Sequence, residues 1–359
     1  MKRILPFLII GLGAVTSVTV MARAQARPAG APAAAPAQPA PQGQGQGGGR
    51  PNAPVRDPAN TTNERDNVQI DQFIGDPTNV TGHLSHGGLM TRAILTHGNP
   101  NVPGPAGAVL EFRTQFAKAT LLPKSSTPLI SINNQFLFYV VSGEGRLDDG
   151  KQSWDLHNGI TMLIPPDVQR RFVNTSADPL DMVMVEWPAN AIARKDILVR
   201  DVTLLPYCEE NAHWNNMSKC VFTQADGMTG RVLLVMLMPM TMAAPHPHAF
   251  GTEEVWTKIT PGSIATLLGS ELRDLPQYSA FLAPPNGITW HAQINTSKTE
   301  TEMWLYVAGG NVQTPAPPQT AAAGAGRGGG RGGPGAGNPN LSRDQAVVDQ
   351  ATVKGKPLK

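Results

Sequence analysis

An internal repeat constrains the fold of this chain more than any other feature. The residues Gly150, Asp155, Leu156, Leu163, Pro165 and Pro166 recur, in the same order and spacing, as Gly269, Asp274, Leu275, Leu282, Pro284 and Pro285. The offset is constant, because 269 − 150 and 284 − 165 both equal 119. This pattern indicates two copies of one folding unit of roughly 110–130 residues.

Each copy is made of short β-branched and aromatic runs that are separated by Gly, Pro, Asn and Asp. Such runs are Phe136–Val141 and Met182–Trp187 in the first copy, and Arg231–Met238 and Val255–Thr260 in the second. The chain holds 37 Gly and 33 Pro, and only 16% of its residues are charged, which is typical of turn-rich β structure. Many short strands at regular spacing predict an all-β fold of sandwich or barrel type.

Four side chains of the second copy have the chemistry of metal ligands. His246 and His248, at positions i and i+2 of a strand, point to the same face. Glu254 follows just before an apolar run, and His291 comes one hairpin later. Three neutral imidazoles and one carboxylate that converge inside a barrel make a site for a divalent metal. Glu253 is the alternative carboxylate ligand.

These residues resemble the two motifs of the cupin family, G-x5-H-x-H-x3,4-E-x6-G and G-x5-P-x-G-x2-H-x3-N. Five residues separate His248 from Glu254, or four if Glu253 is the ligand, and one extra residue lies between Gly287 and His291. The resemblance extends over about residues 75–310. It implies two tandem cupin barrels of the double-stranded β-helix, or jelly-roll, type.

The first copy lacks usual ligands at the corresponding positions. The offset of 119 assigns Thr127, Leu129 and Gln135 to the places of His246, His248 and Glu254, and Arg170 lies four residues before Asn174 as His291 lies before Asn295. The first barrel therefore resembles a cupin without its metal. Two interpretations stay open. Arg170, Gln135 and Tyr139 bind an anionic group, or Arg170 is a surface residue of a scaffold domain. His83 and His86 are interpreted as structural or surface residues, with a second small metal site as the alternative.

The resemblance implies an open metal position that holds Mn, Fe, Zn or Cu. Glu253 and Tyr278 are the candidate acid–base residues. We expect an exported, metal-dependent bicupin enzyme, most simply a dioxygenase-type oxidoreductase that acts on a small organic molecule. The alternatives are a metal-dependent lyase or isomerase, a small-molecule-binding cupin without catalysis, and a storage or interaction protein.

The ends of the chain differ in composition from the repeats. Lys2 and Arg3 precede an apolar run, and Ala24-Gln25-Ala26 reads as a cleavage site, which together predict a Sec-type signal peptide over residues 1–26 and a secreted or periplasmic protein. We predict a disordered linker at 27–65, barrels at 66–200 and 201–312, and a disordered Gly/Arg-rich tail at 313–359.

Export also bears on the two cysteines, Cys208 and Cys220. An oxidising compartment permits a disulfide between them, and two free buried thiols are the alternative. The net charge of +2 gives no reason to expect nucleic-acid or membrane partners, and no membrane anchor is predicted. The expected partner is a small molecule, bound by a monomer or a homo-oligomer.

Overall fold

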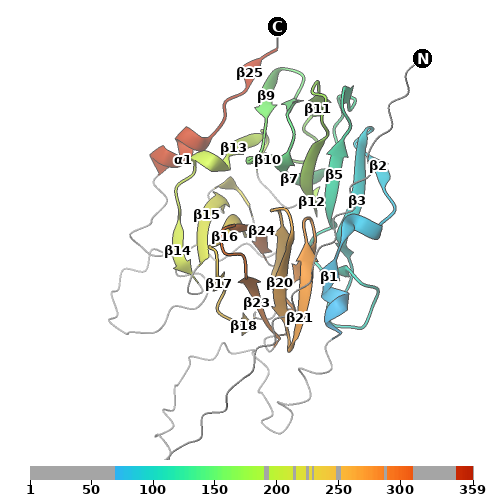
Figure 1. Cartoon of the computed structure of the whole chain (residues 1–359). Coiled ribbons are helices and arrows are strands. Elements are labelled where there is room, and N and C mark those ends of the chain that lie inside the picture. The colour runs from blue at the N-terminus through green and yellow to red at the C-terminus, as the bar shows by residue number, and fades with distance from the viewer. Residues whose placement is uncertain are drawn as a thin grey trace, which may run out of the picture. The chain divides into compact units, whose positions relative to one another are not determined.

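The computed structural model describes residues 69–189, 194–212, 216–223, 226–228, 230–247, 252–286, 289–309 and 345–358. These residues form sheets arranged as two barrels (Figure 1), in which every strand pair except β3–β4 is antiparallel among the described residues. The all-β fold with two tandem barrels is therefore confirmed. The predicted signal peptide, the predicted linker, His248 and Gly287 lie outside the described residues.

The first barrel is built from two facing sheets. Its larger sheet has the order β13 (Leu198–Asp201), β10 (Ile160–Ile164), β7 (Asn134–Ser142), β12 (Leu180–Pro188), β5 (Gln115–Leu121), β3 (Leu89–His97) and β2 (His83–Ser85), with β4 (Ala108–Leu110) beside β3. Its smaller sheet has the order β25 (Lys356–Pro357), β9 (Gln152–Leu156), β8 (Gly145–Asp148), β11 (Arg171–Asn174) and β6 (Ser125–Ser126). The 3-10 helix η5 (Val202–Leu204) follows β13.

The second barrel repeats this arrangement. Its larger sheet has the order β1 (Ile74–Gly75), β22 (Ala280–Leu282), β19 (Glu253–Lys258), β24 (Glu302–Gly309), β16 (Arg231–Leu237), β15 (Asn216–Phe222) and β14 (Glu209–Ala212). Its smaller sheet has the order β17 (Thr241–Met242), β23 (Trp290–Asn295), β20 (Ser263–Leu268) and β21 (Glu271–Pro276), with β18 (His246–Pro247) beside β23. The 3-10 helices η2 (Ile70–Phe73) and η3 (Pro77–Asn79) flank β1.

The sequence of strand β7 is apolar at successive positions, without the alternation of a half-exposed strand, and the packing of its two faces shows why. Phe136 and Phe138 belong to the core inside the first barrel, with Phe172. Leu137 and Tyr139 belong to a second cluster, which extends into the second barrel. A strand that is covered on both faces needs apolar residues at every position.

The strand register corrects the predicted match between the two copies. Leu137 lies opposite Leu163, and Val255 lies opposite Leu282. Because Leu163 and Leu282 are repeat partners, Val255 corresponds to Leu137, at an offset of 118 (255 − 137). Glu254 therefore corresponds to Phe136, and the predicted match to Gln135 is wrong by one residue.

A second correction concerns His246. It lies opposite His291, whereas Arg170, the partner of His291 in the repeat, forms a bridge with Ile130. The structural counterpart of His246 is therefore Ile130 and not Thr127. Loops of different length in the two copies change the offset between strands, so one constant offset cannot align all of them.

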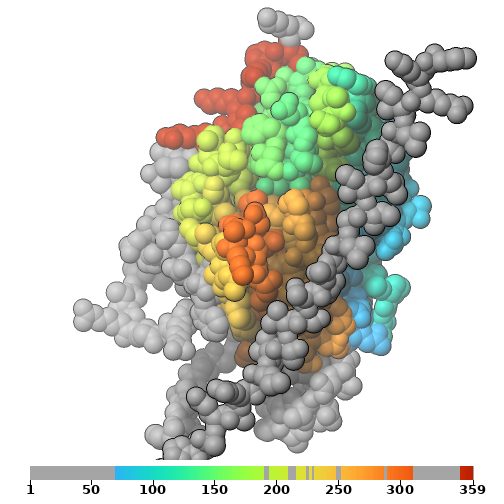
Figure 2. Space-filling model, in the orientation of Figure 1, coloured from blue at the N-terminus to red at the C-terminus, as the bar shows by residue number. Residues whose placement is uncertain are grey.

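The described C-terminal segment also differs from the prediction of a disordered tail at 313–359. Residues 345–358 contain helix α1 (Gln345–Ala351) and strand β25, which pairs with β9. Val348 and Ala351 are fully buried, and the backbone N–H of Val353 donates to the carbonyl of Val199 at 2.9 Å. In Figure 2 this segment, in red, lies against the green surface of the first barrel. Composition missed it because few apolar residues anchor it.

The two cysteines form a disulfide between the start of the second barrel and strand β15. The Cα atoms of Cys208 and Cys220 are 5.7 Å apart, and their sulfur atoms are bonded. The disulfide alternative is therefore confirmed over that of free thiols.

Candidate metal centre

Two of the predicted ligands face each other across a strand pair. His246 in β18 lies directly opposite His291 in β23, and the centroids of the two imidazole rings are 4.5 Å apart. His246 Nδ1 is 2.8 Å from the carbonyl oxygen of Ala244. A carbonyl can only accept, so Nδ1 carries the proton and Nε2 the lone pair. This hydrogen bond is the support that metal-binding histidines commonly have.

The carboxylate of Glu254 reaches the same place from β19. Its Oε1 lies 3.9 Å from His291 Nε2. The indole Nε1 of Trp256 donates to Oε1 at 2.9 Å, and the hydroxyl of Tyr306 donates to Oε2 at 3.0 Å. A carboxylate oxygen accepts more than one bond, so both hydrogen bonds are compatible with metal ligation and fix the orientation of the group.

The site is enclosed by aromatic rings. Glu254 and His291 are buried, at 2% and 0% exposure, and the rings of Trp256 and Phe281 lie 5.9 and 5.7 Å from that of His291. Burial, together with the negative charge of Glu254, raises the pKa of Tyr306 above its ordinary value. Tyr306 therefore keeps its proton at neutral pH and acts as a donor. Sequence analysis missed Tyr306, because only the pairing of β24 with β19 brings it opposite Trp256.

The alternative carboxylate, Glu253, points away from the imidazoles. Its Oε1 accepts from Arg113 Nη1 at 2.6 Å, and its Oε2 accepts from the backbone N–H groups of Glu111 and Phe112 at 2.6 and 2.9 Å. These donors belong to the first barrel. Adjacent residues of a strand face opposite sides, so Glu254 and not Glu253 faces His291.

Tyr278, the other candidate acid–base residue, also contacts the first barrel. Its hydroxyl lies 3.4 Å from Asp181 Oδ2, and the Lys118 ammonium lies 4.3 Å from the centroid of its ring. Burial and the charge of Asp181 raise the pKa of Tyr278 above its ordinary value. The structure thus brings His246, His291 and Glu254 together, and directs Glu253 and Tyr278 to the contact between the barrels.

The donor chemistry of the site fits a divalent metal. Two imidazoles and one carboxylate converge, and His248, the fourth predicted ligand, lies outside the described residues. Within the described residues, no group of three His, Cys, Asp or Glu already has metal-binding geometry. Two ligand atoms at about 2.1 Å from one tetrahedral ion would be about 3.4 Å apart, so the 3.9 Å between His291 Nε2 and Glu254 Oε1 would shorten by about 0.5 Å on binding.

Comparison with known proteins agrees with this fold. Residues 119–186, in the first barrel, match the family described as a cupin domain. A putative glyoxylate-induced protein from Pseudomonas aeruginosa is similar over 66% of this chain and 86% of its own, at 14% identity and a TM-score of 0.51. Procruciferin, an 11S globulin from Brassica napus, is similar over 67% and 85%, at 11% identity and a TM-score of 0.51. The chain has the fold of a two-domain cupin.

A third solved structure with this two-domain cupin fold is an oxalate decarboxylase variant from Bacillus subtilis, similar over 69% of this chain and 79% of its own, at 12% identity and a TM-score of 0.50. No curated protein matches the chain in sequence. Identities this low show the fold alone, and the similar structures include both an oxalate decarboxylase and an 11S globulin. The activity of this chain must therefore be argued from its own site.

The first cupin barrel has neither the ligands nor their supports. Ile130, Phe136 and Arg170 stand where the second barrel has His246, Glu254 and His291. The pocket predicted from Arg170, Gln135 and Tyr139 is not formed inside this barrel, because Tyr139, and Gln135 by alternation, face the opposite side of β7 from Phe136. His83 is exposed, whereas His86 is buried and its Nε2 lies 3.4 Å from Arg170 Nη2.

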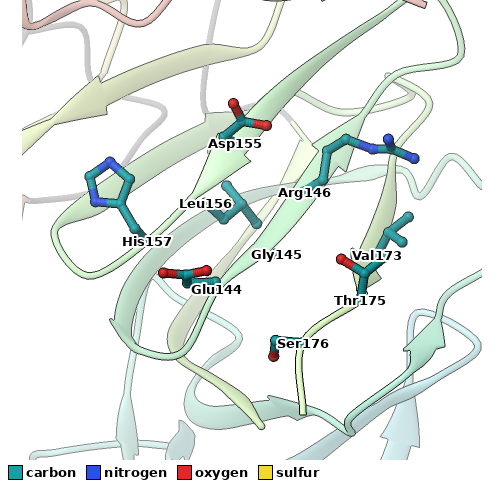
Figure 3. Close-up of a pocket in the computed structure, with 9 residues that line it drawn as sticks. All are labelled: Glu144, Gly145, Arg146, Asp155, Leu156, His157, Val173, Thr175 and Ser176. Carbon is teal, nitrogen blue, oxygen red and sulfur yellow. The ribbon is translucent and has the colours of Figure 1, made fainter. Parts of the chain in front are cut away.

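A surface hollow of about 460 Å³ lies on the first cupin barrel, beside β8, β9 and β11 (Figure 3). It is lined by Glu144, Gly145, Arg146, Asp155, Leu156, His157, Val173, Thr175 and Ser176. Lys356 Nζ lies 2.5 Å from Asp155 Oδ2, so the C-terminal strand borders the hollow. None of the predicted site residues lines it. Among the described helices, none is long and apolar enough to cross a membrane.

Proposed function

We propose that this cupin is an exported, metal-dependent oxidoreductase of the dioxygenase type, which acts on a small organic molecule at the second barrel. The convergence of His246, His291 and Glu254 carries the proposal. The two hydrogen bonds to Glu254 from Trp256 and Tyr306 support it, since they fix the orientation of the carboxylate beside His291, as the supports of metal ligands do.

The residues of the site would bind the metal, supply negative charge and exclude water. His246 and His291 offer imidazole nitrogens, and Glu254 offers one negative charge. A bound Mn, Fe, Zn or Cu ion would supply Lewis acidity and, if it is redox-active, an affinity for dioxygen. The rings of Trp256, Phe281 and Tyr306 exclude water from the buried side of the site.

Access to the site is from the side of His246. His291 and Glu254 are buried, whereas His246 is only half-buried. Trp290, which lies next to His291 and opposite Pro247, is 39% exposed. A substrate would therefore approach past His246 and Trp290, and meet the open side of the proposed centre.

Export is supported by the signal-like N-terminus and by the disulfide between Cys208 and Cys220, because disulfides persist mainly in oxidising compartments. A protein that takes up its metal outside the cytoplasm meets competition from zinc and copper, which bind such nitrogen-rich sites more tightly than manganese or iron. The metal must therefore be identified in protein from its own compartment.

Elemental analysis of the exported protein, purified without chelator or added metal, tests the proposal. We expect about one ion per chain in the wild type and in His83→Ala, a matched change at an exposed histidine, and almost none in His291→Ala. Manganese, iron or copper, with oxygen uptake on small organic acids or alcohols, supports the oxidoreductase. Metal retained in His291→Ala would overturn the site.

One observation favours a second function. Both Glu254 and His291 are buried, as the ligands of a structural or non-catalytic centre would be. A small-molecule-binding cupin without turnover is the alternative that burial favours. A lyase or isomerase with a redox-inert metal is the nearest catalytic variant of the proposed enzyme. Stoichiometric zinc without oxygen uptake would favour that alternative.

A further inference from the structure

Arg170 is a buried cation inside the first barrel. Its side chain is fully buried, at the position that His291 occupies in the second barrel. Nη1 donates to the carbonyl of Val168 at 3.2 Å, and Nη2 lies 3.4 Å from His86 Nε2. A guanidinium has five N–H donors, so three of them, including that of Nε, have no acceptor among the described residues.

No carboxylate compensates this charge at contact distance. Within the described residues, no acidic oxygen lies within 4.0 Å of the Arg170 guanidinium, in contrast to the paired Arg113 and Arg200. Burial lowers the pKa of Arg170 to about 10, although the field of Glu186 raises it, so the group is charged at neutral pH. Glu186 is engaged elsewhere, by Gln115 Nε2 at 2.7 Å and Asn134 Nδ2 at 2.6 Å.

The surroundings of Arg170 are aromatic. Its guanidinium carbon lies 4.6 Å from the ring centroid of Phe136, and the ring of His86 contacts those of Phe136, Phe138 and Phe172 edge-on. Burial and the charge of Arg170 lower the pKa of His86 to about 3, so the imidazole is neutral. A buried charge with unfilled donors in apolar surroundings is costly unless a further partner is present.

We propose that the first barrel binds a small monocarboxylate at Arg170, independently of the metal centre. One uncompensated positive charge selects a single negative charge. The planar fork of the guanidinium fits a carboxylate, which accepts two parallel N–H bonds. The phenylalanine rings beside the guanidinium are apolar, which favours a short hydrocarbon group on the anion. A strongly hydrated dianion such as sulfate would lose its water without sufficient compensation.

Titration of the full-length protein with acetate, followed by calorimetry, tests this proposal. We expect one saturable site in the wild type and in His291→Ala, which removes a proposed metal ligand from the other barrel. Arg170→Gln should weaken acetate binding at least about tenfold. Glu186→Gln should strengthen it, because this change removes the nearby negative charge that opposes the anion.

The variants separate this proposal from the proposed function. Binding that is lost in His291→Ala would place the acetate on the metal centre and overturn the proposal. Unchanged binding in Arg170→Gln, or no gain in Glu186→Gln, would also overturn it. If Arg170→Gln does not fold, Glu186→Gln and a crystal structure with acetate decide. Acetate on the guanidinium supports the site, and water molecules alone on it exclude the site.

Discussion

The hydroxyl of Tyr306 donates a 3.0 Å hydrogen bond to Oε2 of Glu254, and the indole Nε1 of Trp256 donates to the other carboxylate oxygen, Oε1. Both donors come from neighbouring strands and point into the second barrel. The corresponding residues of the first barrel, Met184 and Phe138, have no such donor. The hydrogen-bonded carboxylate thus distinguishes the two barrels as clearly as the ligands do.

Tyr306→Phe should weaken metal binding without unfolding the protein. The change removes only the hydroxyl that orients Glu254, and the loss of such a support lowers metal affinity by about tenfold or more. Competition with a chromogenic chelator measures the affinity. Tyr139→Phe is the matched control, because Tyr139 is equally buried but lies in the first barrel. An identical affinity in Tyr306→Phe and wild type would contradict the role of the hydroxyl.

Glu253→Gln should destabilise the protein but leave the metal in place. The change leaves the Arg113 guanidinium buried without its counter-charge, which costs about 3–5 kcal/mol. Urea denaturation measures the free energy of unfolding. The double variant Arg113→Met/Glu253→Leu should regain much of the loss. Loss of metal in the folded Glu253→Gln variant would instead identify Glu253 as a ligand.

His86 should make the first barrel sensitive to acid. In the folded state the pKa of His86 is about 3, below the ordinary value of 6.5. Between these two pH values the unfolded chain binds a proton at His86 and the folded state does not. Its contribution to stability is complete above pH 6.5 and is lost as the pH falls, at about 1.4 kcal/mol per unit between pH 6 and 3. The difference in unfolding free energy between wild type and His86→Gln, measured from pH 7 to pH 4, checks this slope. A difference that does not change with pH would refute it.

Deletion of residues 345–359 should destabilise the first barrel. It removes the buried side chains of Val348 and Ala351 and leaves Trp154 Nε1 without the carbonyl of Val353, a combined loss of about 3 kcal/mol. Lys356→Ala is the control, since its pair with Asp155 is exposed and contributes little. A deletion variant as stable as the wild type would show that the segment adds nothing to the fold.

The sequence predicted the fold because the repeat and the short apolar runs can be recognised directly in the order of the residues. It also predicted that His246, His291 and a glutamate converge. It left Glu253 as an alternative to Glu254, because the two are adjacent at the start of the same strand. Only the pairing of β19 with β22 and β24 shows that Glu253 faces Arg113.

The errors have two physical origins, unequal loop lengths in the two copies and contacts between residues that are distant in the sequence. The match of Glu254 to Gln135 assumed that loops of equal length connect the strands of both copies. The pocket of Arg170, Gln135 and Tyr139 depended on that match. The docking of residues 345–358 depends on contacts with Val199 and Trp154, which are far away in the sequence. Such distant contacts leave no local pattern.

Strands β1 and β25 have a consequence for how the chain is made. Ile74 pairs with Phe281 in the second barrel, and Pro357 pairs with Gln152 in the first. Each barrel therefore takes an edge strand from the part of the chain beyond the other barrel. The second barrel can pair with β1 as soon as β22 emerges, whereas the first barrel must wait for β25. Pairings between residues more than 200 positions apart slow folding. An export route that delivers the polypeptide unfolded would suit such a molecule, because the first barrel is completed only by β25, which follows the whole second barrel in the chain.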